Sequence, residues 1–174
     1  MTTTILFIRH GEAHNPADIV YLRTPDIHLS EKGKRQTEEV AEFLKDERIA
    51  AIYHSPMERA QETAAIIARR FPDAPVASSE LIHEVRSPTY QGKHRTEMEQ
   101  LNWNFYDHRQ HPDDEAREDV LRRLLQFKDE MLAQQAGQPV IWVGHGDPIA
   151  ILTLWARGYP LVHRNMPRGA WYIG

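Results

Sequence analysis

The sequence predicts an α/β fold in which short buried strands alternate with helices around a mostly parallel sheet. Residues 4–8 and 139–143 are apolar runs rich in β-branched side chains, and a turn containing glycine and histidine closes each of them. Such runs are typical of buried strands that end at a loop. Between the two runs, segments with apolar residues at helical spacing alternate with further short apolar runs, which favours strand–helix units.

The first half of the chain contains helix and strand signals in alternation. A helix is predicted over residues 30–45, and a strand over residues 49–53 follows it. For the next helix, we expect Ser55 to act as the cap, and Glu58 to complete a capping box three residues later. This helix therefore begins directly after the second strand.

The second half contains a long helix, a short insertion and a second histidine-bearing strand. A small strand is predicted around residues 76–77 and a long helix over residues 114–135. Between them, residues 88–112 show no persistent period, and we expect a short irregular insertion that caps the site, with its aromatic residues packed in cap or core. Asp147, followed by proline, predicts the start of a last helix, and residues 169–173 are predicted to form a last strand.

The composition narrows the classes of protein to which the chain can belong. With 174 residues, we expect residues 1–174 to form a single domain with a substantial core. The absence of cysteine excludes disulfides, thiolate metal sites and cysteine nucleophiles. We expect a cytoplasmic protein, because the chain has no secretory signal and no apolar stretch near the ~20 residues that span a membrane. The formal net charge of −4 argues against a nucleic-acid interface.

Two histidines follow the two apolar runs, His10 after the first and His145 after the second. Ligands of open α/β sheets bind in the crevice beyond the carboxyl ends of the strands, so we expect both imidazoles to reach one crevice. Arg9 precedes His10, and Arg59 lies near the start of the second helix, where the helix dipole also favours an anion. Imidazoles beside guanidinium groups are suited to chemistry on phosphate, in an electropositive crevice.

Four blocks of sequence also carry a family resemblance. They are RHGE at residues 9–12, LSEKGKRQ at 29–36, SPMERAQETA at 55–64 and VGHG at 143–146. Together and in this order, they resemble the histidine phosphatase superfamily, the phosphoglycerate mutase-like proteins of branch 1. The resemblance implies a three-layer α/β/α sandwich and a reaction that passes through a phosphohistidine.

The resemblance assigns roles to the residues at the matching positions. His10 would be the nucleophile, whose Nε2 attacks phosphorus while a backbone carbonyl holds Nδ1–H. Arg9 and Arg59 would bind the phosphate oxygens, and His145 with Gly146 would complete the phosphate site. For either histidine alone, a satisfied polar residue at a strand end is the more common explanation. The four blocks together favour catalysis.

The resemblance also implies a glutamate as proton donor on the loop after the third strand. Glu84, eight residues before Gly92, fits this place, and nearby phosphate oxyanions should raise the pKa of Glu84 and favour its acid form. The alternative is a solvated loop carboxylate. The family often carries an asparagine six residues after the nucleophile; Pro16 stands there instead, with Asn15 one position earlier, so the role of Asn15 is left open.

The prediction is a metal-independent phosphatase that acts on a small phosphorylated substrate, or on a phosphoprotein. Ten histidines raise the question of a metal, but none stands at a recognisable ligand spacing, so we expect no metal and no cofactor. Two alternatives stay open: a phosphoglycerate mutase-type phosphotransferase, and a catalytically silent module that binds phosphate or a phosphoprotein. The short insertion favours hydrolysis, because a mutase must exclude water from its phosphohistidine. The substrate and the oligomeric state are left open.

Overall fold

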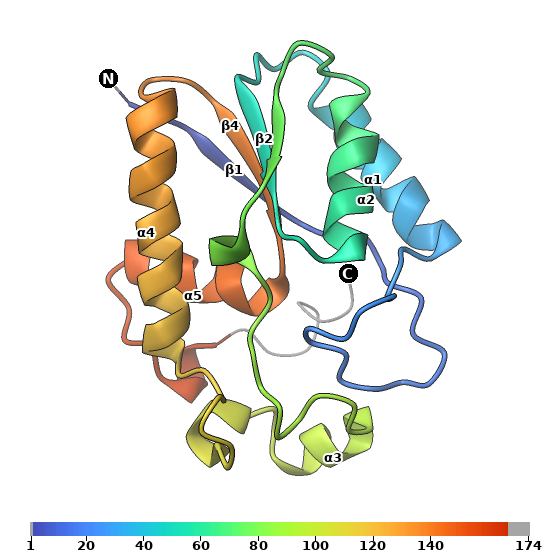
Figure 1. Ribbon diagram of the computed structural model, residues 1–174, viewed down its shortest axis with the longest axis vertical. Helices are drawn as coiled ribbons and strands as arrows, with labels where there is room; N and C mark the ends of the chain where they lie inside the picture. The colour runs from blue at the N-terminus through green and yellow to red at the C-terminus, as the bar shows by residue number, and fades with distance from the viewer. Residues whose placement is uncertain (1, 167–174) are drawn as a thin grey trace.

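A sheet of four parallel strands forms the centre of the computed structural model, which describes residues 2–166 (Figure 1). The strands are β1 (Ile5–Arg9), β2 (Ala51–His54), β3 (Val76–Ser78) and β4 (Val140–Gly144). Their order in the sheet is β1-β4-β2-β3, so β4 lies between β1 and β2 and pairs with both. The two histidine-bearing strands are therefore direct neighbours.

Helices cover both faces of this sheet. They are α1 (Glu31–Phe43), α2 (Glu58–Ala68), α3 (Arg95–Gln100), α4 (Arg117–Gln135) and α5 (Gly146–Ala156). Figure 1 shows α1 and α2 on one face and α4 and α5 on the other. This arrangement confirms the predicted three-layer α/β/α fold with a parallel central sheet.

The alternation of side chains along β4 explains why both faces are covered. Ile141 and Val143 belong to the apolar core with α1 and α2, whereas Val140 and Trp142 belong to the core with α4 and α5. Every residue of β4 is buried. A continuous apolar run is therefore what a strand in the middle of this sheet requires.

The N-terminus of α1 agrees with the sequence prediction, but that of α2 does not. Ser30 caps α1 by accepting a hydrogen bond from the backbone N–H of Gly33 at 3.0 Å. The predicted capping box at Ser55 is wrong: α2 begins at Glu58, and Met57 occupies the cap position without a side-chain bond. The Ser55 hydroxyl accepts from the backbone N–H of Met57 at 3.4 Å, before the helix begins, and lies 2.7 Å from a ring nitrogen of His145.

The starts of α4 and α5 also differ from prediction. Helix α4 begins at Arg117 because Asp114 is occupied elsewhere, accepting hydrogen bonds from the segments around Thr89 and Gln110. Helix α5 begins at Gly146, so Asp147 lies in its first turn and is not its cap. Both aspartates are buried.

The insertion predicted over residues 88–112 contains α3 and a 3₁₀ turn, Phe105–His108. In Figure 1 it lies beyond the ends of the strands at which the histidines are found. The last strand predicted at residues 169–173 lies outside the described residues. Among residues 2–166, no helix has the length and apolar character needed to cross a bilayer.

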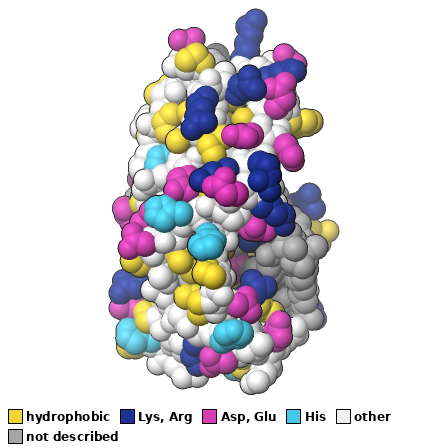
Figure 2. Space-filling model, turned by 90° about the vertical axis from the view of Figure 1, so that its right-hand side faces the viewer, with side chains coloured by type: hydrophobic (Ala, Val, Ile, Leu, Met, Phe, Trp, Pro, Cys, Tyr) yellow, Lys and Arg dark blue, Asp and Glu magenta, His cyan; other side chains and the backbone are white. Residues whose placement is uncertain are grey.

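The face formed by α1 and α2 carries charges of both signs. Figure 2 shows basic and acidic side chains intermingled over this side of the molecule. Glu42, for example, lies 2.7 Å from both Lys45 and Arg70. Exposed pairs of this kind contribute little to the free energy of folding, so this surface offers no account of function.

Candidate active site

The sheet brings His10 and His145 together. Arg9 at the end of β1 is in register with Gly144 at the end of β4, so the next residue of each strand is one of the two histidines. The ring centroids lie 5.2 Å apart, edge to face. Both side chains are buried, His145 completely.

The backbone around His10 fixes which ring nitrogen carries the proton. Its Nδ1 lies 2.7 Å from the carbonyl oxygen of Gly11. A carbonyl only accepts, so Nδ1 carries the proton and Nε2 presents its lone pair. Burial, and after it the charge of Arg59, lowers the pKa of His10 to about 3. His10 is therefore a neutral imidazole with Nε2 facing the site.

Arg59 is a buried guanidinium that joins the two histidines. Its Nε donates to Nε2 of His10 at 3.2 Å, and Nη2 donates to the carbonyl of Leu22 at 2.7 Å. Nη2 also lies 3.3 Å from Nδ1 of His145. Within the described chain, its buried Nη1 has no hydrogen-bond partner. A buried cation with an unused donor indicates a place for an anion.

His145 lies between a hydroxyl and a carboxyl group. Its Nε2 is 2.7 Å from the Ser55 hydroxyl, and its Nδ1 is 3.6 Å from Oε2 of Glu84. Burial, followed by the charge of Arg59, lowers the pKa of His145 well below its ordinary value. Because a hydroxyl both donates and accepts, Ser55 can hold either neutral tautomer of His145. His145 can therefore present either a lone pair or an N–H to the site.

Glu84 supplies the carboxyl group that faces His145. Its Oε1 accepts from the backbone N–H of Val85 at 2.8 Å, which leaves Oε2 directed at His145. Burial, and next the carboxylate of Asp147, raises the pKa of Glu84 to about 7. The expected direction of this shift is thus present before any phosphate binds. Asp147 itself accepts a hydrogen bond from the hydroxyl of Tyr106 at 2.8 Å.

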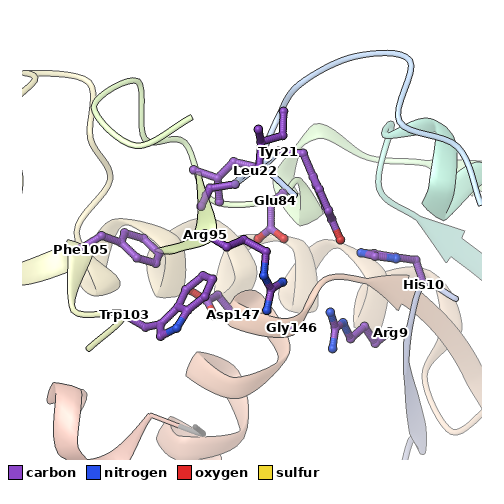
Figure 3. Close-up of a pocket in the computed structure, with 12 residues that line it drawn as sticks. Arg9, His10, Tyr21, Leu22, Glu84, Arg95, Trp103, Phe105, Gly146 and Asp147 are labelled. Atoms are coloured by element: carbon purple, nitrogen blue, oxygen red, sulfur yellow. The ribbon is translucent and has the colours of Figure 1, made fainter. Parts of the chain in front are cut away.

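These groups line one pocket with two different ends (Figure 3). Arg9 and His10 lie at one end and Trp103 and Phe105 at the other, with Glu84 between them. The close-up shows the guanidinium of Arg95 pointing into the space between the two ends. Arg95 stacks over the ring of Trp103 at 5.1 Å. The pocket thus joins a polar end at Arg9 and His10 to a wall that is partly aromatic.

The start of α5 closes the polar end. Gly146 is its first residue and lines the pocket beside Arg9, whose Nε lies 3.7 Å from where a side chain on Gly146 would begin. The N-terminus of a helix with a neighbouring guanidinium favours an anion. Asn15 has a different role, since its side-chain amide binds the backbone of Ile19 and closes its own loop.

A backbone contact holds the loop after β1, which carries His10, against α1. A side chain on Gly11 would begin 2.3 Å from the carbonyl oxygen of Gly33, and one on Gly33 would begin 2.1 Å from that of Glu12. Ser30 adds two hydrogen bonds to Glu12, one from its backbone N–H and one from its hydroxyl, both at 2.8 Å. The block at residues 29–36 is therefore the support on which the loop after β1 rests.

The sequence prediction missed some residues of this site. Ser55 follows β2, and because β2 neighbours β4, the order of the strands would have placed it beside His145. Asp147 was interpreted as a cap, and Trp103 as packing of the cap or core. No sequence signal distinguishes Arg95 from the other arginines of an irregular segment. Among residues 2–166, no cluster of three or more potential ligand side chains could hold a metal ion.

Comparison with known proteins agrees with this geometry. The model of the histidine phosphatase superfamily (branch 1) matches residues 5–169. The chain belongs to this superfamily. A solved structure of YhfR from Bacillus stearothermophilus superimposes with a TM-score of 0.84 at 25% identity, over 96% of this chain and 86% of that one.

Two histidine phosphatase relatives have names that state an activity. Glucosyl-3-phosphoglycerate phosphatase from Mycolicibacterium vanbaalenii is 29% identical over 90% of this chain and 75% of its own. Phosphoserine phosphatase from Entamoeba histolytica, solved with 3-phosphoglyceric acid, is 27% identical with a TM-score of 0.74, over 91% of this chain and 81% of its own. These similarities support a phosphatase-type enzyme.

Proposed function

We propose that this protein hydrolyses small phosphomonoesters, without a metal ion, through a phosphohistidine on His10. The observation that carries the proposal is the state of His10, with Nδ1 held by the Gly11 carbonyl and Nε2 directed at the donors of Arg59. A neutral imidazole whose lone pair faces a buried guanidinium is a nucleophile that lies beside an anion site.

In the first half of the reaction, Nε2 of His10 attacks phosphorus. The new P–N bond forms as the ester P–O bond breaks, and the protonated carboxyl of Glu84 gives its proton to the departing oxygen. Arg9 and Arg59 share the charge of the equatorial oxygens, Arg59 through donors such as its unused Nη1. His145 donates from Nδ1 once Ser55 donates to its Nε2, and the backbone at Gly146 adds the helix dipole.

In the second half, water replaces the leaving group. The carboxylate of Glu84 now accepts a proton from that water, whose oxygen attacks phosphorus as the P–N bond breaks. His10 is restored as a neutral imidazole and inorganic phosphate leaves. A pKa near 7 suits Glu84 to both steps, because its acid and base forms are then both populated at neutral pH.

The outer half of the pocket supports an acidic substrate. Arg95 offers a charge beyond the phosphate end, and Trp103 supports its guanidinium. Relatives named for phosphoserine and glucosyl-3-phosphoglycerate act on phosphomonoesters that carry a carboxylate. We therefore expect phosphomonoesters that also carry a carboxylate to be better substrates than phosphomonoesters whose remaining part is uncharged. A cytoplasmic location stays a prediction.

Labelling of the enzyme tests the reaction directly. Substrate carrying labelled phosphate should leave an acid-labile, base-stable label on the wild-type protein, and His10→Ala should abolish both label and turnover. Turnover should persist in EDTA. His28→Ala, a change at an exposed histidine, is the matched control and should behave as the wild type.

Three outcomes would overturn the proposal. Undiminished turnover in His10→Ala would remove the nucleophile from the mechanism. Efficient interconversion of phosphoglycerates that depends on a bisphosphoglycerate would indicate a mutase. Labelling and turnover absent from the wild-type enzyme with every phosphomonoester in a metabolite panel would indicate a binding module.

A further inference from the structure

A cluster of three charged side chains lies behind residues 81–86, the segment that carries Glu84 and that we call the acid loop, and outside the pocket. Arg23 comes from the loop after β1, Glu115 from the residues before α4, and Arg123 from α4 itself. Glu115 lies at the centre: its Oε1 accepts from Nε of Arg123 at 2.8 Å and its Oε2 from Nη2 of Arg23 at 3.1 Å. The side chains of Glu115 and Arg123 are only 16% and 13% exposed.

The donors of this cluster that remain are aimed at the backbone of the acid loop. Nε of Arg23 donates to the carbonyl of Glu84 at 2.6 Å. Nη1 of Arg123 donates to the carbonyls of Leu81 and His83, each at 2.8 Å. The guanidinium groups of Arg23 and Arg123 thus hold the backbone around Glu84. The carboxylate of Glu115 in turn holds both guanidinium groups in place.

Glu115 also binds the backbone of the acid loop at Arg86. Its Oε2 accepts from the backbone N–H of Arg86 at 2.7 Å, and its own N–H donates to the carbonyl of Arg86 at 2.9 Å. The loop is therefore fixed from its start at Leu81 to two residues after Glu84. Hydrogen bonds that involve charged groups are stronger than neutral ones, so they resist displacement of the loop.

We propose that Glu115, with Arg23 and Arg123, positions the carboxyl of Glu84 for proton transfer to the leaving group. None of the three touches the phosphate end of the pocket, so they are positioning residues that act through Glu84. This inference rests on the proposed function. It also links substrate binding to the acid, because Arg23 directly follows Tyr21 and Leu22 of the pocket wall.

The test compares substrates that differ in their need for an acid. We measure kcat/KM, which reports phosphoryl transfer to His10, with p-nitrophenyl phosphate, phenyl phosphate and glycerol 2-phosphate. In Glu115→Gln, we expect a loss of about 10-fold or more with the two poor leaving groups, since misplacing a catalytic group by about 1 Å can cost about 100-fold. With p-nitrophenyl phosphate the loss should be under about 3-fold, because nitrophenolate departs without a proton.

Arg122 offers a matched control for Arg123. It is the preceding residue of α4, its side chain is 74% exposed, and it pairs with Asp119 on the surface. Arg123→Gln should reproduce the pattern of Glu115→Gln, whereas Arg122→Gln should leave all three substrates unchanged. If Glu115→Gln fails to fold, Arg23→Gln carries the same test from a surface loop.

A double-mutant cycle separates positioning from general damage. If Glu115 acts through Glu84, then Glu115→Gln should cost less than about 2-fold when added to Glu84→Gln, with every substrate. Equal losses for good and poor leaving groups, or a full additional loss in the Glu84→Gln background, would overturn the proposal. Absence of a phosphohistidine in the wild-type enzyme would instead refute the proposed function, so the two failures are distinguishable.

Discussion

The two ends of the pocket are built from different parts of the fold. The phosphate end consists of groups at the ends of β1 and β4 and the start of α2, where Arg59 and His145 are fully buried and Nη2 of Arg59 lies 3.3 Å from Nδ1 of His145. The outer end is contributed by the insertion, where Arg95 is 33% exposed and pairs at 3.2 Å with Asp18, which is 56% exposed. The chemistry is thus preorganised by the core, whereas the contact with the rest of the substrate is adaptable.

This difference predicts how mutations in the two regions behave. At the phosphate end, several partners fix the orientations of Arg59 and His145, so the loss of either side chain leaves developing charge without a donor. At the outer end, a side chain can move or be replaced by water. Mutational effects should therefore fall from the inner residues to the outer ones.

After the loss of turnover expected for His10→Ala, the largest of these effects is expected at His145. His145→Ala removes a donor to the phosphate oxygens and should lower kcat by about 10²–10³, comparable to the loss of one preorganised donor at a developing charge. The loss should be similar for all phosphomonoesters, which steady-state kinetics with several substrates will check. A loss confined to one substrate would assign His145 to substrate choice instead.

An intermediate effect is expected at Glu84, and it should depend on pH. Because the pKa of Glu84 is raised to about 7, kcat/KM with poor leaving groups should fall as the pH rises through 7, where the acid form is lost. Glu84→Gln should remove this fall of kcat/KM with pH. It should also lower kcat/KM for substrates with poor leaving groups by about 10²-fold, a typical contribution of a general acid. With p-nitrophenyl phosphate, both the pH dependence and the loss should be small.

The stability of the protein should show the same titration. The folded-state pKa of Glu84 lies above its ordinary value, so between about pH 4.5 and 7 the unfolded chain binds fewer protons and the free energy of unfolding falls as the pH rises. Chemical denaturation of Glu84→Gln should show less of this fall than the wild type. An identical dependence in both proteins would mean that the Glu84 carboxyl is not buried in its acid form.

The smallest effect is expected at Arg95. Arg95→Gln should raise KM for substrates that carry a carboxylate by about 3- to 10-fold, since a partly exposed charge pair contributes about 1 kcal/mol. For p-nitrophenyl phosphate, KM should be unchanged. Arg157→Gln, at an exposed position after α5, is the control. An equal rise in KM for all substrates would mean that Arg95 binds the phosphate group. The proposed difference between the two ends of the pocket would then be wrong.

The contrast also explains what sequence reasoning could predict. Strand periodicity and the four sequence blocks predicted the parallel fold, and they placed His10, Arg59 and His145 where the structure brings them together. These residues follow strands or begin a helix, so local signals locate them. Ser55 looked like a cap because its local sequence fits one, while its actual partner lies 90 residues away. Long-range polar contacts of this kind have no local signature.

The outer end could not be predicted for a related reason. Arg95 lies in the insertion, whose two ends are joined by Asp114, a buried carboxylate that accepts hydrogen bonds from Thr89 and from the backbone N–H of Gln110. Several hydrogen bonds to that carboxylate hold its pKa well below the usual range. In the sequence, Asp114 resembles an ordinary helix start, and nothing in its neighbours indicates that it joins two loops.

The contact between Gly11 and Gly33 constrains how the chain can diverge. Gly33 lies in the first turns of α1, where alanine would favour the helix by about 1 kcal/mol. Any side chain there would collide with the backbone of Glu12, in the loop after β1, and a side chain on Gly11 would collide with the backbone of Gly33. In a library of all single substitutions, both positions should therefore accept nothing but glycine, and no exchange at one of them can be rescued by a change at the other.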